Sequence, residues 1–400
     1  MNVSDRAAAV QPSATLTISS RAKAMQAEGR DIISFAIGEP DFDTPDHITA
    51  AAIEALRSGQ TKYTPAAGLP ALRQAVADHL ADVYGLTYSP EQVVVSCGAK
   101  YALYNAFQVL LNPGDEVIIP TPYWVTYPDQ VRLAGGRPVF VQADANDGFR
   151  LHAEAVADHI SDRTAVILLN SPGNPTGAVY DRDAVAAIGQ LAVEHDLTII
   201  SDEIYAQLVY DGAEHVSPAA LDPDINDRTV TINGFSKTYA MTGWRLGYAA
   251  APIEIARAMA RVQSQVTSNP TTFAQHGAIA ALTGSQACVR EMVEAFAKRR
   301  RVTIEGLNAI PGISCQTPYG AFYALADVSA LFGREIAGET VTDSLAFARV
   351  CLDRAWVAVI HGSAFGADRC VRLSYATGLE NIERGLARLR DLIVDGTTLA

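Results

Sequence analysis

The sequence contains only five lysines, and one of them, Lys237, lies in the segment SKTYAMTGWRLG together with Arg245. The apolar run 229–232 comes just before this segment, so we expect a strand to deliver Lys237 to a loop. A lysine amine can form a Schiff base with an aldehyde, and an arginine can hold a phosphate through two parallel hydrogen bonds. The pair therefore points to a cofactor that carries both groups, which is pyridoxal phosphate (PLP). For such a pair taken alone, a surface lysine beside a glycine-flanked turn is the alternative.

Polar residues follow three other apolar runs at the point where each run ends. Asn174 lies in NSPGNPTG after 165–169, Asp202 lies in SDEIY after 198–200, and Gly98 lies in SCGAK after 93–95. Ligands of open α/β sheets bind at the carboxyl ends of the strands. A turn that opens a helix can also offer its backbone N–H groups to an anion. An unpaired buried carboxylate is costly, so Asp202 is either a helix N-cap or the partner of a buried cation such as a protonated pyridine nitrogen.

Short apolar runs alternate with helical patterns through most of the chain. The runs are almost continuously apolar, which is typical of strands covered on both faces. They lie at 93–95, 116–119, 165–169, 197–200, 229–232 and 246–249. Alternating β and α units predict a mostly parallel sheet with helices on both sides.

The two ends of the chain differ from the middle in the secondary structure that their sequence predicts. The first 45 residues are expected to be irregular, since they end in the proline-containing GEPDFDTP, and a helix is expected to begin at Asp46. A long helix over 286–307, followed by strands near 321–326, 357–360 and 371–374, predicts a smaller C-terminal α/β domain.

Composition excludes several classes of protein. With 400 residues and 49% hydrophobic content the chain can bury a large core and is expected to form two domains. A net charge of −13 argues against a nucleic-acid or anionic-membrane partner. Five scattered cysteines fit a reducing compartment. The sequence has no signal-peptide pattern, no apolar run long enough to span a membrane and no metal-ligand spacing among its histidines. We therefore expect a cytoplasmic protein without a metal.

Nine blocks in order resemble the fold-type I PLP-dependent aminotransferases of class I, particularly the aspartate aminotransferase branch common in bacteria. The blocks are GEPDFDTP, KYTPAAG, CGAKYAL, NPGDEV, PYWVTYP, NSPGNPTG, SDEIY, the lysine loop and VRLSYA. The resemblance implies a mostly parallel central sheet sandwiched by helices, with a smaller C-terminal α/β domain. Its expected boundaries are an N-terminal arm and part of the small domain at 1–45, a large PLP-binding domain at 46–290 and a small domain at 291–400.

The resemblance also implies roles around the cofactor ring. Lys237 is implied to form the Schiff base and later to move a proton between two carbon atoms. Asp202 is implied to pair with the pyridine nitrogen, and Asn174 and Tyr205 to hydrogen-bond the phenolic oxygen of the ring. Trp124 is implied to stack on the ring face.

At the phosphate, the matching residues are Arg245 and the backbone of Gly98 and Ala99. Tyr63 matches a tyrosine that reaches the phosphate from the neighbouring subunit, which implies a homodimer with shared sites. Many relatives carry a serine three residues before the lysine, where this chain has Gly234, so Ser236 is the nearer hydroxyl.

Arg372 matches the arginine that grips the substrate α-carboxylate, with help from the Gly38 backbone, and Trp124 and Asn174 border the same substrate. The ligand of a distal carboxylate is open, because Ser264 stands where vertebrate-type aspartate enzymes have an arginine. Thr15 and Lys100 match positions near the substrate side chain and the cofactor, and Lys100 is the best available cation. A solvated helix lysine is the alternative for Lys100.

These residues together predict a transaminase with a ping-pong mechanism that moves an amino group between an L-amino acid and a 2-oxo acid. Aspartate with 2-oxoglutarate is the favoured pair, and an aromatic or prephenate-type aminotransferase is the second possibility. A PLP-dependent lyase or decarboxylase on the same scaffold shares every cofactor contact. A PLP-sensing regulatory module is a further alternative, but such modules usually carry a helix-turn-helix domain for which this acidic chain has no room.

Overall fold

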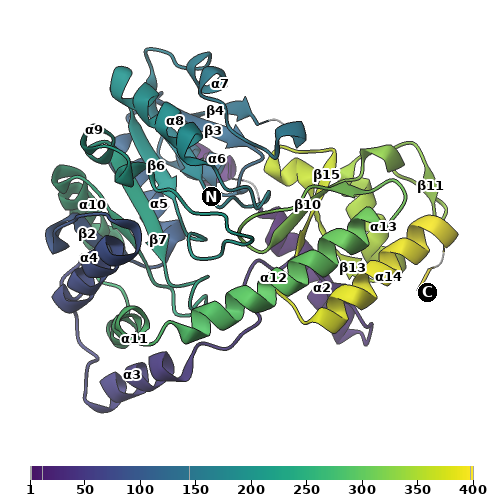
Figure 1. Ribbon diagram of the computed structural model, residues 1–400, viewed down its shortest axis with the longest axis horizontal. Coiled ribbons are helices and arrows are strands. Elements are labelled where there is room, and N and C mark those ends of the chain that lie inside the picture. The colour runs from purple at the N-terminus through teal and green to yellow at the C-terminus, as the bar shows by residue number, and fades with distance from the viewer. Residues whose placement is uncertain (1, 11, 144, 397, 400) are drawn as a thin grey trace.

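The computed structural model describes residues 2–10, 12–143, 145–396 and 398–399. Its larger part is built around a seven-stranded sheet and its smaller part around a four-stranded sheet. The long helix α12 (Ala287–Asn308) runs from one part to the other (Figure 1). This arrangement confirms the predicted α/β fold with a smaller C-terminal α/β unit.

The large sheet is mostly parallel, as predicted. Only β8 runs antiparallel to its neighbours β2 and β7. In spatial order the strands are β2 (Val93–Ser96), β8 (Gly247–Ala250), β7 (Thr229–Gly234), β6 (Thr198–Asp202), β5 (Thr164–Asn170), β3 (Glu116–Thr121) and β4 (Arg137–Gln142). All six predicted runs form strands. The edge strand β4 was not predicted, because it is partly exposed and lacks a continuous apolar run.

Helices cover both faces of this sheet. One face packs against α5 (Ala99–Leu110), α6 (Tyr127–Leu133) and α10 (Ile253–Val266). The other face packs against α4 (Pro70–Tyr84), α8 (Arg182–Glu194), α9 (Pro223–Asn226) and α11 (Thr272–Thr283). The helix α3 (Asp46–Arg57) lies against α11, and α7 (Ala153–Ala157) lies beside α8.

The smaller part contains an antiparallel sheet covered by helices. Its strands are, in order, β14 (Ile360–His361), β15 (Cys370–Ser374), β10 (Tyr323–Asp327) and β9 (Ser314–Cys315). Two further pairs are β1 (Ile33–Ser34) with β13 (Val357–Ala358), and β11 (Glu335–Ile336) with β12 (Glu339–Thr340). The helices are α12, α13 (Ser344–Ala355) and α14 (Leu379–Asp395). The predicted strand at 357–360 is therefore two short strands. The division between the domains at residue 290, inside α12, stays a prediction.

The expectation that the first 45 residues are irregular was wrong. They contain α1 (Asp5–Ala8), α2 (Ala14–Ala27) and β1, and α2 lies against β13 and β14 of the smaller part. The sequence pattern hid α2 because that helix buries only Ala22 and Met25, so it has no apolar stripe of the usual width. Its position brings the N-terminal segment close to the site described below.

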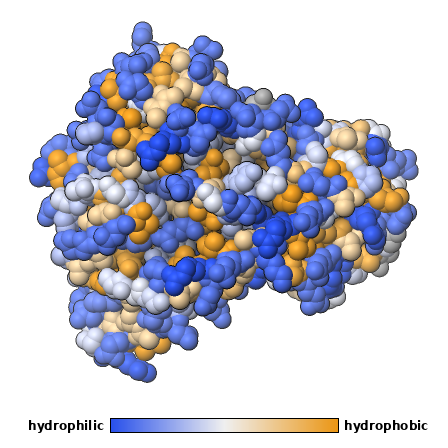
Figure 2. Space-filling view, in the orientation of Figure 1, coloured by the Kyte–Doolittle hydropathy of each residue, from blue (hydrophilic) through white to orange (hydrophobic). Residues whose placement is uncertain are grey.

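The outer surface is mixed in character. On the face shown in Figure 2, hydrophobic side chains are scattered between hydrophilic ones over both parts of the molecule. Among the described residues, none of the helices combines the length and the apolar character that crossing a bilayer requires.

Candidate active site

A cavity of about 390 Å³ lies at the carboxyl ends of β5, β6 and β7. Residues from the smaller part, among them Tyr323 and Arg372, complete its wall, so it lies between the two parts. Twelve of the fourteen residues predicted for the site line it: Thr15, Gly38, Ala99, Lys100, Trp124, Asn174, Asp202, Tyr205, Ser236, Lys237, Arg245 and Arg372. The other two, Gly98 and Tyr63, are not in its lining.

Lys237 lies in the loop after β7, as the apolar run predicted. Its Nζ atom donates a hydrogen bond to the Gly38 carbonyl oxygen at 2.5 Å. Burial lowers the pKa of Lys237 to about 8, aided by the positive charges of Arg372 and Arg245 and opposed by the carboxylates of Glu39 and Asp202. A neutral amine is the nucleophilic form of lysine. The environment therefore prepares this side chain for attack near neutral pH.

The departure at Gly234 has a structural reason. A Cβ atom at this position would lie 2.8 Å from the Gly247 Cα atom, so the strands β7 and β8 could not approach as they do. A serine there would push β8 away from the loop that follows β7. The hydroxyl of Ser236 lines the cavity instead.

Asp202 is buried at the end of β6. It accepts hydrogen bonds from the Tyr127 hydroxyl at 2.7 Å and from the Ile204 N–H at 3.3 Å. Burial raises the pKa of Asp202 to about 6 in spite of these two donors. The helix N-cap interpretation is wrong, because residues 204–207 form a turn. The carboxylate thus has a desolvation cost that a cation in the cavity would offset.

A second end of the cavity suits an anion. Gly98 precedes the first residue of α5 with a φ of +88°, and a Cβ atom there would lie 2.7 Å from Arg245 Nη2. The glycine therefore lets the guanidinium lie against the start of the helix. The first N–H groups of a helix lack intrahelical acceptors and attract anions. Helix start and guanidinium together form a cradle for a phosphate.

Arg372 is buried and faces the cavity from β15. Its Nη1 atom donates to Asn174 Oδ1 at 3.0 Å, and its Nη2 atom donates to the Ala36 carbonyl at 2.8 Å. The guanidinium lies 4.5 Å from the centre of the Tyr323 ring, and its Nε atom has no hydrogen-bond partner in the part of the chain that the structure describes. Within the described residues no carboxylate forms an ion pair with Arg372. A ligand carboxylate is the partner that this buried cation lacks.

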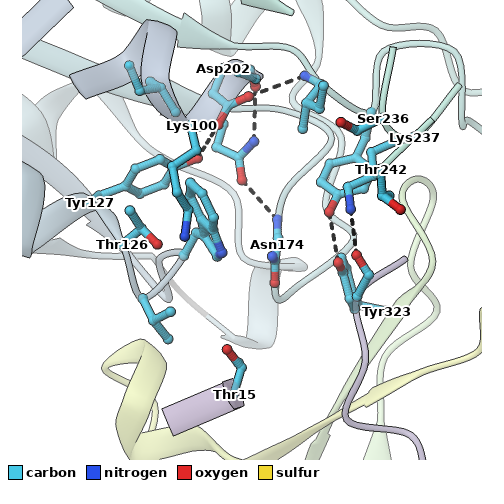
Figure 3. A pocket seen from close by; sticks show the side chains of 18 of the residues that line it. Thr15, Lys100, Thr126, Tyr127, Asn174, Asp202, Ser236, Lys237, Thr242 and Tyr323 are labelled. Atoms are coloured by element: carbon cyan, nitrogen blue, oxygen red, sulfur yellow. Dashed lines mark hydrogen bonds between the residues drawn. The ribbon is translucent and has the colours of Figure 1, made fainter. Parts of the chain in front are cut away.

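Lys100 and Thr15 both line the cavity, and Figure 3 shows Thr15 at its lower side and Lys100 near Asp202. The Lys100 Nζ atom lies 4.8 Å from the centre of the Trp124 ring. Burial and the charge of Arg245 lower the pKa of Lys100. Lys100 thus lines the cavity, and the residue is also exposed to solvent in the single chain, so its role at the site stays a prediction. Ser264 does not line the cavity, and its hydroxyl donates to the Arg261 carbonyl on α10.

Three residues that position the site were not singled out from the sequence. Tyr127 contacts Asp202, and the Asn170 amide donates to the Asp202 carbonyl at 2.9 Å while its Oδ1 accepts from the Asn174 N–H at 2.9 Å. The Tyr323 hydroxyl is 2.8 Å from the Tyr205 hydroxyl. Figure 3 shows Tyr127 and Asp202 on one side of Asn174, and Lys237 and Tyr323 on the other. Tyr127 and Asn170 lie in PYWVTYP and NSPGNPTG, but those blocks do not indicate which way their side chains point.

Tyr63 lies outside the cavity. It is in the loop after α3, and 90% of its surface is exposed. Among the described residues, no cluster of three histidine, cysteine or acidic side chains could hold a metal ion.

Comparisons with known proteins agree with this chemistry. Residues 30–389 match the family model for aminotransferase class I and II. The chain is 48% identical over 389 residues to an aspartate aminotransferase of Geobacillus stearothermophilus, covering 97% of this chain and 98% of the relative. It is 47% identical to an aspartate/prephenate aminotransferase of Cereibacter sphaeroides, with the same coverage. The structure of aspartate aminotransferase from Thermus thermophilus with maleate superposes with a TM-score of 0.93 at 44% identity, covering 98% of this chain and all of that one.

The chain belongs to the class I and II aminotransferases. It is therefore an enzyme of the transaminase type, and its cofactor is PLP.

The residues of the cavity fit this cofactor. Lys237 offers a buried amine of lowered pKa for the aldehyde. Asp202 forms no ion pair with a cation of the described residues, and a protonated ring nitrogen would supply one. Arg245 at the start of α5, beside a glycine that leaves room for it, suits the phosphate. The amine, the carboxylate and the anion cradle are thus three separate features that match three groups of one molecule.

Proposed function

We propose that this enzyme transfers the amino group of L-aspartate to 2-oxoglutarate, at an active site completed by a second copy of the chain. The observation that carries the proposal is that Arg372 and Lys100 both line one cavity and that neither forms an ion pair with a carboxylate of the described residues. Dicarboxylic substrates have two negative groups, and each cation suits one of them. The Thermus relative was solved with maleate, which is also a dicarboxylate.

The cofactor-holding residues have distinct tasks. When bound, PLP supplies an aldehyde that takes up the amino group and a ring that withdraws electrons from the substrate carbon. Asp202 holds the ring nitrogen in its protonated form, and the Tyr127 hydroxyl fixes the carboxylate. Trp124 covers one face of the ring, and Asn174 and Tyr205 donate to its phenolic oxygen. At the other end Arg245, Ser236 and the N–H groups at Gly98 and Ala99 hold the phosphate, beside Lys100.

Lys237 performs the proton transfers. Its amine, freed when the substrate enters, removes a proton from the substrate α-carbon. It then delivers this proton to a second carbon atom. Burial favours the neutral form that this step needs. The Gly38 carbonyl accepts a hydrogen bond from Nζ and keeps the amine on the substrate side of the cavity.

The substrate is held at both ends. Arg372 binds the α-carboxylate, with Asn174 fixing the guanidinium through its Oδ1 atom and the Gly38 backbone close by. Lys100 and Thr15 bind the distal carboxylate. Apolar residues Leu16 and Leu103 also line the cavity. They favour an aromatic or prephenate-type oxo acid as a second substrate, and the Cereibacter relative is an aspartate/prephenate aminotransferase.

A half-reaction tests the proposal against a lyase. The purified enzyme incubated with L-aspartate alone is expected to release one equivalent of oxo acid per subunit and no ammonia, and to stop until 2-oxoglutarate is added. Continuous release of ammonia or pyruvate without a second oxo acid would contradict transamination. The Lys237→Ala variant is the control, and it is expected to release neither product.

The second copy is proposed from the face that carries Tyr63. The exposed apolar residues Ile53 and Leu56 lie on α3, just before the Tyr63 loop. Together with the exposed Tyr63 they give this face an apolar character that suits a protein interface. A homodimer in which Tyr63 contacts the partner's phosphate site explains why this aromatic side chain is exposed to solvent in the single chain. We also propose that the enzyme acts in the cytoplasm and divides into domains at residues 45 and 290.

A further inference from the structure

The loop that carries Tyr63 is anchored at almost every second residue. The Thr272 hydroxyl donates to the Lys62 carbonyl at 2.6 Å. Gln275 donates from Nε2 to the Thr64 hydroxyl at 3.3 Å and accepts at Oε1 from the Leu69 N–H at 2.7 Å. The Ala66 carbonyl accepts a hydrogen bond from Gln263 Nε2 at 2.6 Å. Three side chains on α10 and α11 thus fix the backbone on both sides of Tyr63.

These anchors are buried although their groups are polar. Gln263 and Gln275 are both 0% exposed, and Thr272 is buried as well. A buried amide is costly unless it is hydrogen-bonded. Gln275 Nε2 also donates to the Pro270 carbonyl at 2.9 Å, and Gln263 Nε2 to the Val95 carbonyl at 2.8 Å. Both amides are therefore hydrogen-bonded in the interior, and each has at least one bond to this loop.

Gln263 also connects the loop to the anion cradle of its own chain. Its Oε1 atom accepts a hydrogen bond from the Ser96 hydroxyl at 2.6 Å. Ser96 ends β2, two residues before Gly98. One buried side chain thus holds both the segment that leads to the cradle and the loop that carries Tyr63.

The backbone of this loop is held in place, but the Tyr63 side chain is exposed, which indicates that the side chain contacts a second molecule. The loop backbone is held by buried amides, whereas the aromatic side chain between the anchors is 90% exposed. Holding the backbone of a surface loop in one conformation costs conformational entropy. That cost has a purpose if the side chain must meet a second molecule at a defined place.

We propose that Gln263, Thr272 and Gln275 are positioning residues that act in trans: they hold Tyr63 where it reaches the phosphate site of the partner subunit. The inference rests on the proposed homodimer. It assigns an effect on cofactor binding in one subunit to buried side chains of the other subunit. None of the three residues lines the cavity of its own chain.

The first experiment measures the PLP dissociation constant of the apo-enzyme by fluorescence titration. Thr272→Val removes the bond to the Lys62 carbonyl and keeps the shape of the side chain. We expect the dissociation constant to rise about threefold to tenfold, as for the loss of one hydrogen bond, and to rise in the same direction in Tyr63→Phe. Gln275→Met is expected to have a larger effect, since it removes several bonds at once.

Two controls separate this effect from a general loss of structure. Thr272→Ser keeps the hydroxyl and is expected to restore wild-type affinity. Thr283→Val removes a similar hydroxyl-to-carbonyl bond on the same helix, to Ile279, at an exposed position. It is expected to leave the affinity unchanged. Equal losses in Thr283→Val and Thr272→Val would overturn the inference.

Hybrid dimers decide between cis and trans action. In a hybrid of Thr272→Val with Lys237→Ala, the one site that retains Lys237 belongs to the Thr272→Val subunit and receives Tyr63 from an intact loop. Borohydride reduction fixes PLP on Lys237 and so counts this site alone. We expect wild-type affinity in this hybrid. When both substitutions are in one subunit and the partner is wild type, the surviving site receives the altered loop, and weak binding is expected.

The outcomes also separate this inference from the proposed dimer. If Tyr63→Phe shows no trans effect in the same hybrids, the shared active site is wrong. If Tyr63→Phe acts in trans whereas Thr272→Val acts in cis or has no effect, the shared site stands and the positioning role of the buried anchors is refuted.

Discussion

At the scale of single residues, burial gives the cavity its chemistry. Lys237 and Asp202 are both desolvated, and in each case the charged form is disfavoured: the pKa of the amine is lowered to about 8, and that of the carboxyl is raised to about 6. The two side chains approach from neighbouring strands, β7 and β6. An added cationic ring would relieve the carboxylate, whereas the amine benefits from staying neutral. The same low-dielectric cavity therefore serves two opposite requirements.

Asp202→Asn is expected to change two properties in opposite directions. The amide still accepts from Tyr127, but it carries no charge, so PLP binding should weaken by at least tenfold. The apo-enzyme should become more stable by up to about 3 kcal/mol at pH 8, because the folded state no longer holds a desolvated charge. Chemical denaturation of the apo-enzyme and a PLP titration measure the two effects.

The pH dependence has a definite sign. The Asp202 pKa is raised from 3.8 to about 6 in the folded protein, so between these values the unfolded chain loses its proton first. The contribution of this group to stability therefore falls as the pH rises from about 4 to 6, and it stays constant above that range. Asp202→Asn should remove this slope. A variant that is less stable than the wild-type apo-enzyme at pH 8 would contradict the assigned cause.

Lys100→Met tests which carboxylate each cation binds. Removing a charge-assisted hydrogen bond should lower kcat/KM for aspartate about 10- to 100-fold and leave alanine almost unaffected. Arg372→Ala is the matched comparison, and it should impair both amino acids because both have an α-carboxylate. Steady-state kinetics with the two donors measures the ratio. Equal losses for aspartate and alanine in Lys100→Met would remove Lys100 from the distal site.

At the scale of elements, the start of α5 and the loop after β7 work as a unit. Arg245 has a φ of +55°, and its Nη1 atom donates to the Thr242 carbonyl at 2.9 Å. The guanidinium is thus fixed by its own loop and reaches the start of α5 only because Gly98 has no Cβ atom. The cradle depends on the contact between two elements that are far apart in the sequence.

Gly98→Ala is expected to weaken the binding of PLP and of inorganic phosphate about tenfold. The new Cβ would lie 2.7 Å from Arg245 Nη2, and the φ of +88° is strained for alanine. Isothermal titration of the apo-enzyme with each anion checks both values. Gly243→Ala, in the same loop as Arg245, is the control, because a Cβ atom there meets nothing within 4 Å. Similar losses in both variants would argue against the cradle.

At the scale of the whole molecule, α12 joins the two parts through an arginine that is only 1% exposed. Arg300 pairs with Asp211, donates to the Pro318 carbonyl at 2.8 Å, and lies 5.0 Å from the Tyr210 ring centre. Asp211 and Pro318 belong to segments that also meet in the bridge between Val209 and Gly320. Arg300 therefore holds together the two segments that contain Asp211 and Pro318. Their contact helps to place Arg372 over the carboxyl ends of the large sheet.

Arg300→Met is expected to lower the free energy of unfolding by about 2 kcal/mol. The Pro318 carbonyl loses its donor, whereas the half-exposed Asp211 can regain water. Urea denaturation of the holoenzyme measures the change. Arg301→Met, the next residue of α12 and an exposed one, should change stability by less than about 0.5 kcal/mol. An equal loss in both variants would show that only helix propensity is involved.

Prediction from the sequence succeeded where the signal is local. Six of the seven strands of the large sheet are continuous apolar runs, because helices cover both faces, and each of these six was predicted within one or two residues. Prediction failed for α2, which buries only the two residues Ala22 and Met25, and for the partly exposed edge strand β4. In the cavity, Lys237 and Asp202 were predicted because each comes just after an apolar run, and the end of such a run can be read from the sequence. Tyr127 and Tyr323 were not, because the direction of their side chains depends on packing.

The sequence alone determined the chemistry that is available: a scarce lysine after an apolar strand, a carboxylate after the next, and an arginine with glycines around it. Local periodicity and residue type encode these features directly. Only the tertiary structure decided which groups meet. Arg372 contacts Asn174 across 198 residues of chain, Lys100 turns toward the cavity, and Ser264 does not line it. The physical reason is that such contacts depend on how sheets and helices pack, and no short stretch of sequence records that packing.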